Sequence, residues 1–423
     1  MKSPTFNDCF ATSGARMTVA EALHRFSEKL APTVGTEEVA TRAAARRLLA
    51  RDIVSARRIP PHDNAAVDGF AVFFDDLDPD APTTLGIGGT VAAGHPLGRS
   101  AERGSAYKIF TGAQVPEGAD TIFMVEDCEI SGATVTLPDG IKRGANLRLA
   151  GEDVQAGDVV MRRGMLLRPQ EIGMAASLGL ERLPVYRRLR AAVFSTGDEV
   201  RDPGETLDDG SIYDINRYTL LSLLDGLGCA PTDLGIFKDE ADVIRQGLAD
   251  AAADHDVVIT SGGVSMGEED HIRGAVEDLG SLFFWNLAIK PGRPIALGCI
   301  PGGGGEVPFI GLPGNPVASM VTFMQIARPI LLRLAGAENL RAASYRVPSA
   351  FDFKKKSGRR EWLRARLEAQ ADGTLAAVKF PEEGSGILTS MVQSDGLVVL
   401  DEACEAVRAG ELVEFVPFNE VLR

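Results

Sequence analysis

Apolar residues near the start of the chain recur at helical spacing. After Thr18, a residue suited to an N-cap, they fall three or four positions apart: Val19, Leu23, Phe26 and Leu30. This spacing predicts a helix that begins at Thr18. The segment 37–50 is rich in Ala and Arg and predicts a second helix, which the prolines at 60 and 61 separate from the next part of the chain.

Residues 62–145 show a different pattern, with short apolar runs between Gly- and Pro-containing turns. The expected strands are 69–74, 107–111 and 121–125. They predict a small β domain. Residues 157–180 then contain a strand-like patch followed by a helix at 169–178, which has a proline at its start.

From residue 190 to 335 the pattern alternates between short apolar runs and helical segments. The expected strands are 191–195, 257–260, 283–289 and 309–312. The expected helices are 216–227, 240–253, 271–279 and a long one from Asn315. This alternation predicts a parallel sheet covered on both faces, in which ligands bind at the carboxyl ends of the strands. Residues 345–420 return to short strands and turns, and Gly302–Gly305 is expected to be a hairpin loop.

The length, net charge and composition of the chain limit the classes of protein to which it can belong. The 423 residues suggest about three domains, and a formal net charge of −15 disfavours nucleic-acid binding. An anionic ligand therefore needs a local basic pocket. Five scattered cysteines and five scattered histidines show neither disulfide nor zinc spacing. No secretory signal and no apolar run long enough for a membrane span is evident, so we expect a soluble cytoplasmic protein.

Glycine-rich segments follow two of the expected strands. Residues 195–199 come after the first strand, and residues 261–267 come after the second and lead to Asp270 before a helix. Glycines let backbone N–H groups approach an anion, and a following helix N-terminus favours negative charge. Neither segment has the Walker ending or the Rossmann spacing. A tight turn before a capped helix explains such a segment about as well as phosphate binding does.

Cations and rigid turns follow two later strands. Lys290 and Arg293 flank a Pro-Gly turn, and the segment 311–316 sets Asn315 as an N-cap with Pro316 as the first helical residue. Arg359 and Arg364 add positive charge in the last part of the chain, although a charge run is usually a solvated face. The two prolines that flank Gly314 and Asn315 favour a rigid binding edge.

Four carboxylates stand out: Asp68, Glu199, Asp214 and Asp270. Asp214 and Asp270 can each be explained as helix caps. Yet acids and glycine segments at the ends of successive parallel strands converge in space. A hard cation that bridges carboxylates and a phosphate uses such an arrangement.

The order and spacing of these motifs resemble the MoeA family of molybdopterin molybdenumtransferases, a module also found in the E domains of gephyrin and of a plant fusion protein. The resemblance runs from about residue 16 to the C-terminus. It rests on segments 63–71, 110–120, 125–127, 151–153, 195–199, 212–214, 261–270, 290–294, 311–316, 358–361 and 384–386.

The resemblance implies an α/β multidomain fold. It would comprise an elongated helical dimerisation domain (16–60 plus 146–188), an inserted β domain (61–145), a three-layer α/β domain (189–338) and a C-terminal β barrel (339–423). The α/β domain would resemble MogA, with a mostly parallel sheet. Family members are homodimers in which the α/β domain of one subunit faces the β insertion of the other.

The resemblance also implies a role for each matching residue. Asp68 and Thr111 would face the site from the partner subunit, and Mg²⁺ would bind Glu199, Asp214 and Asp270. Residues for the pterin nucleotide would be Ser261, Gly262, Gly263, Ser265, Pro313 and Asn315. Residues for molybdate would be Lys290, Arg293, Arg359 and Ser385. The chain departs from the common family pattern at Ala66, Val67, Phe70, Arg293, Ala318 and Glu383.

The implied activity is the last step of molybdenum cofactor biosynthesis: insertion of molybdate into the dithiolene of adenylated molybdopterin, with Mg²⁺, releasing AMP. A contact with a molybdopterin adenylyltransferase is compatible with this role. Two alternatives are a non-catalytic scaffold, as the gephyrin E domain also is, and the adenylyltransferase itself, whose domain resembles residues 190–335. The choice between molybdate and tungstate stays open.

Overall fold

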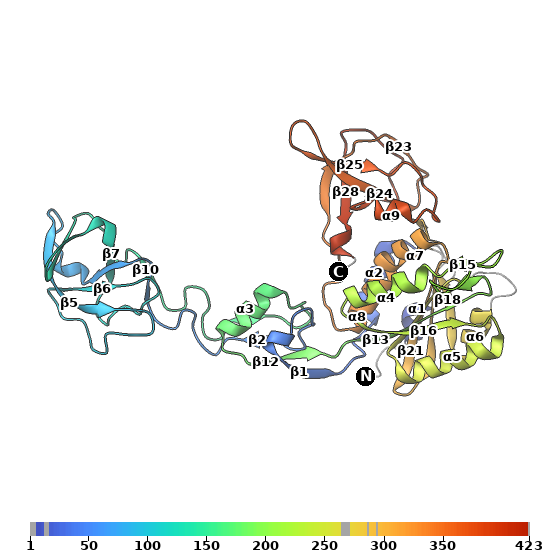
Figure 1. Ribbon diagram of the computed structural model, residues 1–423, viewed down its shortest axis with the longest axis horizontal. Helices are drawn as coiled ribbons and strands as arrows, with labels where there is room; N and C mark the ends of the chain where they lie inside the picture. Colours follow the sequence, from blue (N-terminus) through green and yellow to red (C-terminus); the bar gives the residue numbers. More distant parts are fainter. Residues whose placement is uncertain (1–5, 12–16, 264–270, 286, 293–294, 422–423) are drawn as a thin grey trace.

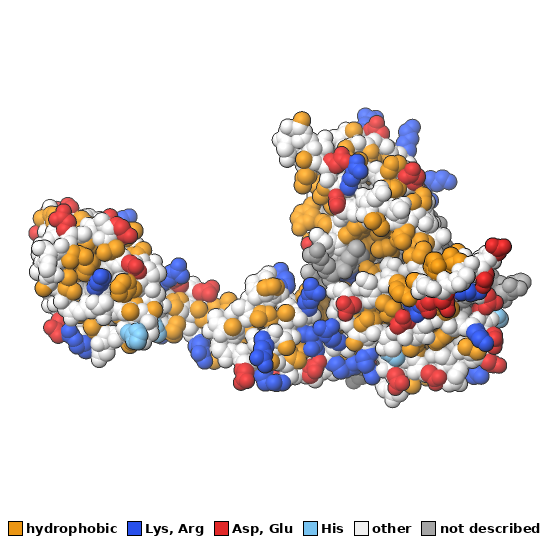
Figure 2. All heavy atoms as spheres, viewed as in Figure 1, with side chains coloured by type: hydrophobic (Ala, Val, Ile, Leu, Met, Phe, Trp, Pro, Cys, Tyr) orange, Lys and Arg blue, Asp and Glu red, His pale blue; other side chains and the backbone are white. Residues whose placement is uncertain are grey.

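The structure is a computed structural model that describes residues 6–11, 17–263, 271–285, 287–292 and 295–421. The molecule is elongated (Figure 1). A β sheet formed by residues 69–137 lies at one end, a narrow middle segment comes next, and a wide head holds the α/β sheet and the C-terminal strands. The space-filling view shows the same narrow arm and wide head, with apolar, acidic and basic side chains interspersed on this face (Figure 2).

The end sheet has six strands in the order β7-β4-β6-β5-β9-β8. They are β4 Gly69–Val72, β5 Thr83–Val91, β6 Ser105–Ile109, β7 Thr121–Met124, β8 Glu129–Ser131 and β9 Thr134–Leu137. Alternate residues bury on opposite faces: Tyr107 and Ile109 belong to one apolar cluster, while Phe70 and Phe123 belong to another. Both faces of the sheet are therefore covered, and the three strands predicted here are confirmed.

The middle segment consists mainly of paired strands. β1 Thr36–Ala40 pairs with β12 Arg182–Tyr186, β2 Ile53–Val54 with β11 Val159–Met161, and β3 Asn64–Ala65 with β10 Leu147–Arg148. The predicted helix α3 Pro169–Ser177 packs there. The helix predicted for 37–50 is wrong, because residues 36–40 are strand β1 and only Thr41–Ala43 form a 3₁₀ turn. Pairing with β12 outweighs the helix propensity of Ala and Arg.

The first predicted helix is confirmed as α2 Val19–Lys29. Thr18 and Glu21 form a capping box at its start, which satisfies two backbone donors. The helix packs in the head rather than in the middle segment, since Phe26 stacks on Trp285 with ring centroids 5.3 Å apart. The short helix α1 Phe6–Phe10 lies beside it, and the Trp285 indole donates to the Phe10 carbonyl.

The head is built on a six-stranded sheet in the order β16-β13-β17-β21-β20-β18. The strands are β13 Arg190–Thr196, β16 Ala230–Phe237, β17 Val257–Ser261, β18 Ser281–Trp285, β20 Ile295–Gly302 and β21 Gly305–Leu312. The first four in the order are parallel, and β20 and β18 are antiparallel to their neighbours. Separate apolar clusters cover the two faces, so the predicted mostly parallel, doubly covered sheet is confirmed.

Helices α4 Asn216–Gly226, α5 Ala241–Asp254 and α6 His271–Leu279 agree with their predictions. The strand predicted for 283–289 is wrong as one element, because β18 ends at Trp285 and Ile289–Lys290 form a separate strand, β19. Strands β16 and β20 were not predicted. β16 lies at the sheet edge and contains Pro231, Asp233 and Gly235, which break the apolar run that marks a buried strand.

The long helix predicted from Asn315 is present as α7 Pro316–Thr322, a π-helical turn η4 Phe323–Ala327 and α8 Arg328–Leu334. Pro329 has no N–H to donate to the carbonyl four residues before it, which favours a widened turn at that place. The Arg328 N–H accordingly bonds the Phe323 carbonyl, five residues back. By length and composition this helix could cross a membrane, but 72% of its apolar window is buried inside the protein, as in a core helix.

The C-terminal part contains a second six-stranded sheet, along the path β19-β24-β26-β28-β22 with β25 beside β24. Its strands are β22 Tyr345–Pro348, β24 Arg360–Ala369, β25 Leu375–Lys379, β26 Gly396–Leu400 and β28 Leu412–Pro417. One bridge, between Ser349 and Ala377, joins the end of β22 to β25. A closed barrel stays a prediction. Smaller elements are β23 Phe353–Lys354, which pairs with β27 Ala406–Val407, and α9 Thr389–Val392.

Candidate functional site

Strand β19 joins the two halves of the head. It follows β18 in the chain but pairs in parallel with β24 of the C-terminal sheet, so that Lys290 lies opposite Glu361. The Arg360 N–H donates to the Ala288 carbonyl at 2.6 Å just before this pairing begins. A loop after the α/β sheet and a strand of the C-terminal sheet therefore meet at one place.

Lys290 and Arg359 share one buried carboxylate there. The Arg359 guanidinium bonds Glu361 Oε1 at 2.7 Å, and the Lys290 ammonium lies 3.5 Å from Glu361 Oε2. The Glu361 side chain is 1% exposed, whereas the Lys290 side chain is 36% exposed. Lys290 also donates to Glu383 at 2.8 Å. Two of the residues predicted for the oxyanion are thus brought together, and Arg293 lies outside the described residues.

Ser385, a third predicted oxyanion residue, lies on the same side of the head. Its carbonyl accepts from the Val317 N–H at 3.0 Å, which attaches the loop to the first turn of α7. The loop is also held by Arg364, which is 4% exposed and donates to the carbonyls of Glu382 and Gly384. Burial lowers the pKa of this arginine. Arg364 was noted in the sequence only as positive charge, and its anchoring role had no sequence signal.

The glycine segments at the strand ends abut one another. The Ser261 hydroxyl donates to the Pro313 carbonyl at 2.8 Å and lies 3.1 Å from the Ser319 hydroxyl, and both serines are buried. The Ser261 side chain, which was predicted to bind substrate, therefore links the two loops by hydrogen bonds. The Gly262 N–H bonds the Leu312 carbonyl, which adds a second tie.

The backbone at the end of β17 requires glycine. Gly262 and Gly263 have φ values of +88° and +62°, and a Cβ on Gly263 would lie 2.6 Å from Ile272 Cδ1. The two loops lie in van der Waals contact, since a Cβ on Gly314 would come 3.5 Å from the Gly262 Cα, and the Asn216 amide donates to the Gly314 carbonyl at 2.7 Å. Asn315 occupies the predicted N-cap position of α7 without a side-chain cap hydrogen bond, so within the described structure its amide group is not used for capping. Ser265 lies outside the described residues.

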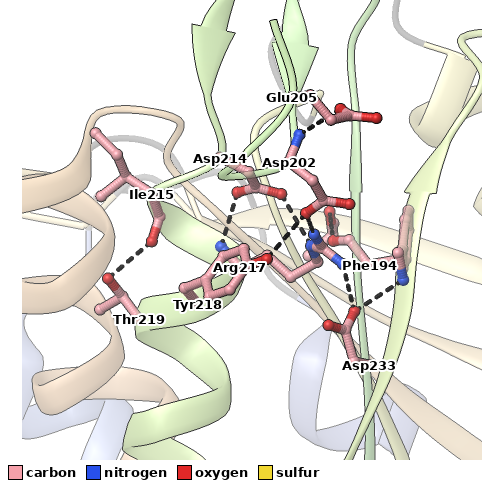
Figure 3. Close-up of polar contacts among 11 residues, drawn as sticks. Phe194, Asp202, Glu205, Asp214, Ile215, Arg217, Tyr218, Thr219 and Asp233 are labelled. Carbon is pink, nitrogen blue, oxygen red and sulfur yellow. Dashed lines mark hydrogen bonds and ion pairs between the residues drawn. The ribbon is translucent and has the colours of Figure 1, made fainter.

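Both carboxylate oxygens of Asp214 form hydrogen bonds with a buried arginine. Its two oxygens accept from the Arg217 backbone N–H and from Arg217 Nε, both at 3.0 Å, and both side chains are 3% exposed (Figure 3). Arg217 also pairs with Asp202 and, at 2.5 Å, with Asp233. Burial lowers the pKa of Arg217, but the hydrogen bonds to Asp233 and Asp214, together with the charges of Asp233 and Asp202, raise it by more. The capping interpretation of Asp214 is thus supported, and the network around Arg217 was not predicted.

Glu199 has a different environment. Its exposed carboxylate lies over Gly197, where an added Cβ would come 2.6 Å from Glu199 Oε2. Its backbone carbonyl accepts from Ile212 at 2.8 Å and so joins the loop to strand β15 Ile212–Tyr213, which pairs with β14 Val200–Arg201. Across the described residues no three His, Cys, Asp or Glu side chains gather as a metal site, and Asp270 lies outside them.

Asp68 and Thr111 form a pair at the far end of the molecule. The Thr111 N–H and hydroxyl both donate to Asp68 Oδ1 at 2.7 Å, and both residues lie beside the end sheet. These two hydrogen bonds, the backbone one first, lower the pKa of Asp68. The predicted pair is brought together, but the narrow middle segment separates it from the head of the same chain (Figure 1).

The described structure also contains two clefts. One, of about 560 Å³, lies in the C-terminal part beside Lys379 and Phe380. The other, of about 620 Å³, lies between α2, the long helix and the C-terminal sheet, beside Arg328 and Trp362. Neither lining includes a residue predicted for the site.

Comparison with known proteins gives a consistent picture along the chain. Residues 17–179 match the MoeA N-terminal region (domain I and II), residues 192–333 a probable molybdopterin binding domain, and residues 346–418 the MoeA C-terminal region (domain IV). The chain is 36% identical to the molybdopterin molybdenumtransferase of Haemophilus influenzae, over 96% of this chain and all of that protein. It is 32% identical to the molybdopterin molybdenumtransferase of a Nostoc species, over 90% of this chain and 88% of that one.

A solved structure agrees at the level of the fold. The crystal structure of a molybdopterin biosynthesis MoeA protein from Pyrococcus horikoshii OT3 superposes with a TM-score of 0.81 and 29% sequence identity. The alignment covers 95% of this chain and the whole of that one. The arm, the end sheet and the head are therefore features that the two chains share.

Proposed function

The chain belongs to the MoeA family of molybdopterin molybdenumtransferases, transferases of molybdenum cofactor biosynthesis, and on that premise we propose that it inserts molybdate into the dithiolene of adenylated molybdopterin. The reaction releases AMP and the finished cofactor, as the last step of that biosynthesis. One observation supports this most directly. Lys290 and Arg359, from separate halves of the head, share the buried carboxylate of Glu361 beside the Ser385 loop.

The cation cluster is the proposed molybdate site. A tetrahedral dianion is bound best by several fixed cationic donors with a hydroxyl nearby. Arg359 supplies a planar fork that its bond to Glu361 orients, and Lys290 supplies a compact charge that is partly exposed. Arg293 and Ser385 complete the proposed set. The buried Glu361 positions both cations and does not itself touch the substrate in this proposal.

The glycine loops at the strand ends are the proposed pterin-nucleotide site. The Ser261 hydroxyl joins the end of β17 to the Pro313 carbonyl, and the Asn216 amide joins the Gly314 carbonyl to the start of α4. The N-terminus of the helix that starts at Pro316 suits a phosphate. Binding both substrates side by side in the head supplies much of the rate advantage of such a transfer, because it removes the entropy cost of bringing them together.

A magnesium ion at this edge of the α/β sheet would have fewer protein ligands than the three carboxylates predicted from the sequence. Asp214 is occupied by Arg217, which leaves Glu199 as the exposed, uncommitted carboxylate among the described members of the predicted set. Mg²⁺ usually takes one or two protein carboxylates and completes its shell with phosphate oxygens and water. Glu199 and the substrate diphosphate therefore suffice to hold it. When bound, the ion would polarise the phosphoanhydride.

We further propose that the active protein is a cytoplasmic homodimer. Asp68 and Thr111 lie at the opposite end of the molecule from the cation cluster, so a contribution to the same site requires a second copy. A transient contact with a molybdopterin adenylyltransferase would hand over the adenylated substrate. A purely scaffolding role is less well supported, because it would not require two cations held on one buried carboxylate at a strand edge.

The test of the function is a defined reaction. The protein is incubated with adenylated molybdopterin, Mg²⁺ and molybdate, and AMP and active cofactor are measured. AMP release that depends on molybdate, with cofactor able to activate an apo-molybdoenzyme, supports the proposal. AMP release without cofactor, or neither product, contradicts it.

A further inference from the structure

The Lys290 ammonium is already in contact with an anion. Glu383 Oε2 accepts from Lys290 Nζ at 2.8 Å, closer than the 3.5 Å between Nζ and the buried Glu361 Oε2. The Glu383 side chain is 42% exposed. Of the two carboxylates on Lys290, Glu361 is enclosed by protein while Glu383 approaches from the solvent side.

Lys290 and Arg359 each already have a carboxylate partner in the described residues, since they face Glu361 and Glu383. The hydrogen bond from Lys290 is the main cause that lowers the pKa of Glu383, so this carboxyl is ionised at neutral pH. Both carboxylates repel a dianion that enters beside them, which offsets much of the attraction of these two cations. Binding is therefore stronger when one carboxylate moves away.

Glu383 is the carboxylate that can leave. It lies on an exposed loop, whereas Glu361 is in a strand and also holds Arg359. A second cation is close at hand, because Lys379 Nζ lies 3.9 Å from Glu383 Oε1. The backbone on either side of Glu383 is fixed by Arg364, so its side chain can turn toward Lys379 without movement of the loop.

We propose that Glu383 is an internal competitor that occupies the oxyanion position on Lys290 and is displaced when molybdate binds. This rests on the proposed function in one respect, namely that the cluster is the molybdate site. A dianion offers Lys290 and Arg359 twice the charge of the carboxylate that it displaces, which favours the exchange.

The probe is the oxyanion alone, titrated calorimetrically into the full-length protein. Molybdate and perrhenate are compared, because they are similar in shape and differ by one unit of charge. The variants are Glu383→Gln and, as a matched control, Glu382→Gln, which changes the net charge equally at an exposed neighbour whose side chain does not contact Lys290. Glu383→Ala repeats the test with the side chain removed.

We expect Glu383→Gln to tighten molybdate binding by about threefold to fivefold, the equivalent of one partly exposed ion pair. Perrhenate must displace the same carboxylate, so its binding should improve by a similar factor, and Glu382→Gln should change neither. In a Lys290→Gln background the gain from Glu383→Gln should vanish, because a double-mutant cycle isolates an effect that acts through Lys290. Unchanged or weaker molybdate binding in Glu383→Gln and Glu383→Ala overturns the proposal, as does an equal gain in Glu382→Gln.

AMP release by the unmodified protein is measured in parallel. If AMP is released but the Glu383 variants bind molybdate normally, the inference fails and the function stands. If the Glu383 variants bind more tightly as expected but no AMP is released, the inference stands and the function fails.

Discussion

At the scale of single residues, the carboxylates near the strand ends differ in what their oxygens contact. Both oxygens of Asp214 bond a buried arginine, while Glu199 is exposed over a glycine. A carboxylate that neutralises a buried cation contributes mainly to stability, and an exposed one at a loop is available for a ligand. The sequence placed both in one metal-binding set because spacing does not reveal which acid already has a partner.

This difference predicts that one isosteric substitution lowers the stability of the fold and that the other abolishes activity. Asp214→Asn should lower the free energy of unfolding by about 1–3 kcal/mol, because Arg217 loses its buried carboxylate partner. Glu199→Gln should change it by less than about 0.5 kcal/mol and abolish AMP release. Urea titrations and AMP assays on both variants check this. A stable Asp214→Asn together with an unstable Glu199→Gln would contradict the assignment.

The pair Asp68 and Thr111 gives a prediction about pH. Thr111→Val keeps the backbone hydrogen bond but removes the hydroxyl one, so the pKa of Asp68 should rise part of the way toward its ordinary value. Because the folded-state pKa is lowered, the stabilisation is present above the unfolded pKa and is lost as pH falls through the folded pKa. Carboxyl NMR titration measures this, with Thr111→Ser as the control that should retain the lowered pKa. An unchanged pKa in Thr111→Val would show that the hydroxyl has no part in it.

At the scale of elements, the sequence predicted segments whose local pattern and tertiary role agree. Helices α2, α4, α5 and α6 and the central parallel strands fall in this group. The sequence-based prediction failed where the pairing partner of a segment determines its secondary structure. Strand β1 is helix-like in composition, and β19 is separated from β18 because it pairs with β24 instead. The same pairing brings Lys290 opposite Glu361, so the carboxylate that holds the cations of the proposed oxyanion site could not be predicted without the tertiary register.

The turn after β19 provides a test at this scale. Gly292 has a φ of +99°, and a Cβ there would overlap the buried Thr322 hydroxyl. Gly292→Ala should therefore lower the free energy of unfolding by roughly 1–3 kcal/mol and weaken molybdate binding by shifting Lys290. Gly304→Ala, in a hairpin turn with no atom within 4 Å of the added Cβ, should be nearly neutral. Denaturation and molybdate titration of both variants check this, and equal losses in the two would contradict it.

At the scale of the whole molecule, the separation of the end sheet from the head determines how a complete site can form. The order of the parts along the chain could be predicted from the changes in pattern, because each part has its own spacing of apolar residues. The length of the arm could not, since it depends on the strand pairs β1–β12 and β2–β11 that hold the middle segment extended.

The proposed shared site predicts complementation between inactive variants. Asp68→Ala and Glu199→Ala should each be inactive, but a refolded equimolar mixture should regain about a quarter of the activity. Random pairing makes half of the dimers mixed, and each mixed dimer has one site free of both substitutions. AMP release from the mixture is the measurement. Failure to regain activity, with mixed dimers demonstrated by mass spectrometry, would place both residues in the site of one chain.

Transfer of molybdenum onto the two sulfurs of the pterin is measured most directly by the molybdenum X-ray absorption spectrum of the small-molecule product, after complete reaction with adenylated molybdopterin. We expect sulfur neighbours around molybdenum, absent when the protein is omitted and absent with Glu199→Gln. A spectrum that shows molybdenum surrounded by oxygen alone, in a reaction that has consumed the adenylated substrate, would contradict the proposed transfer.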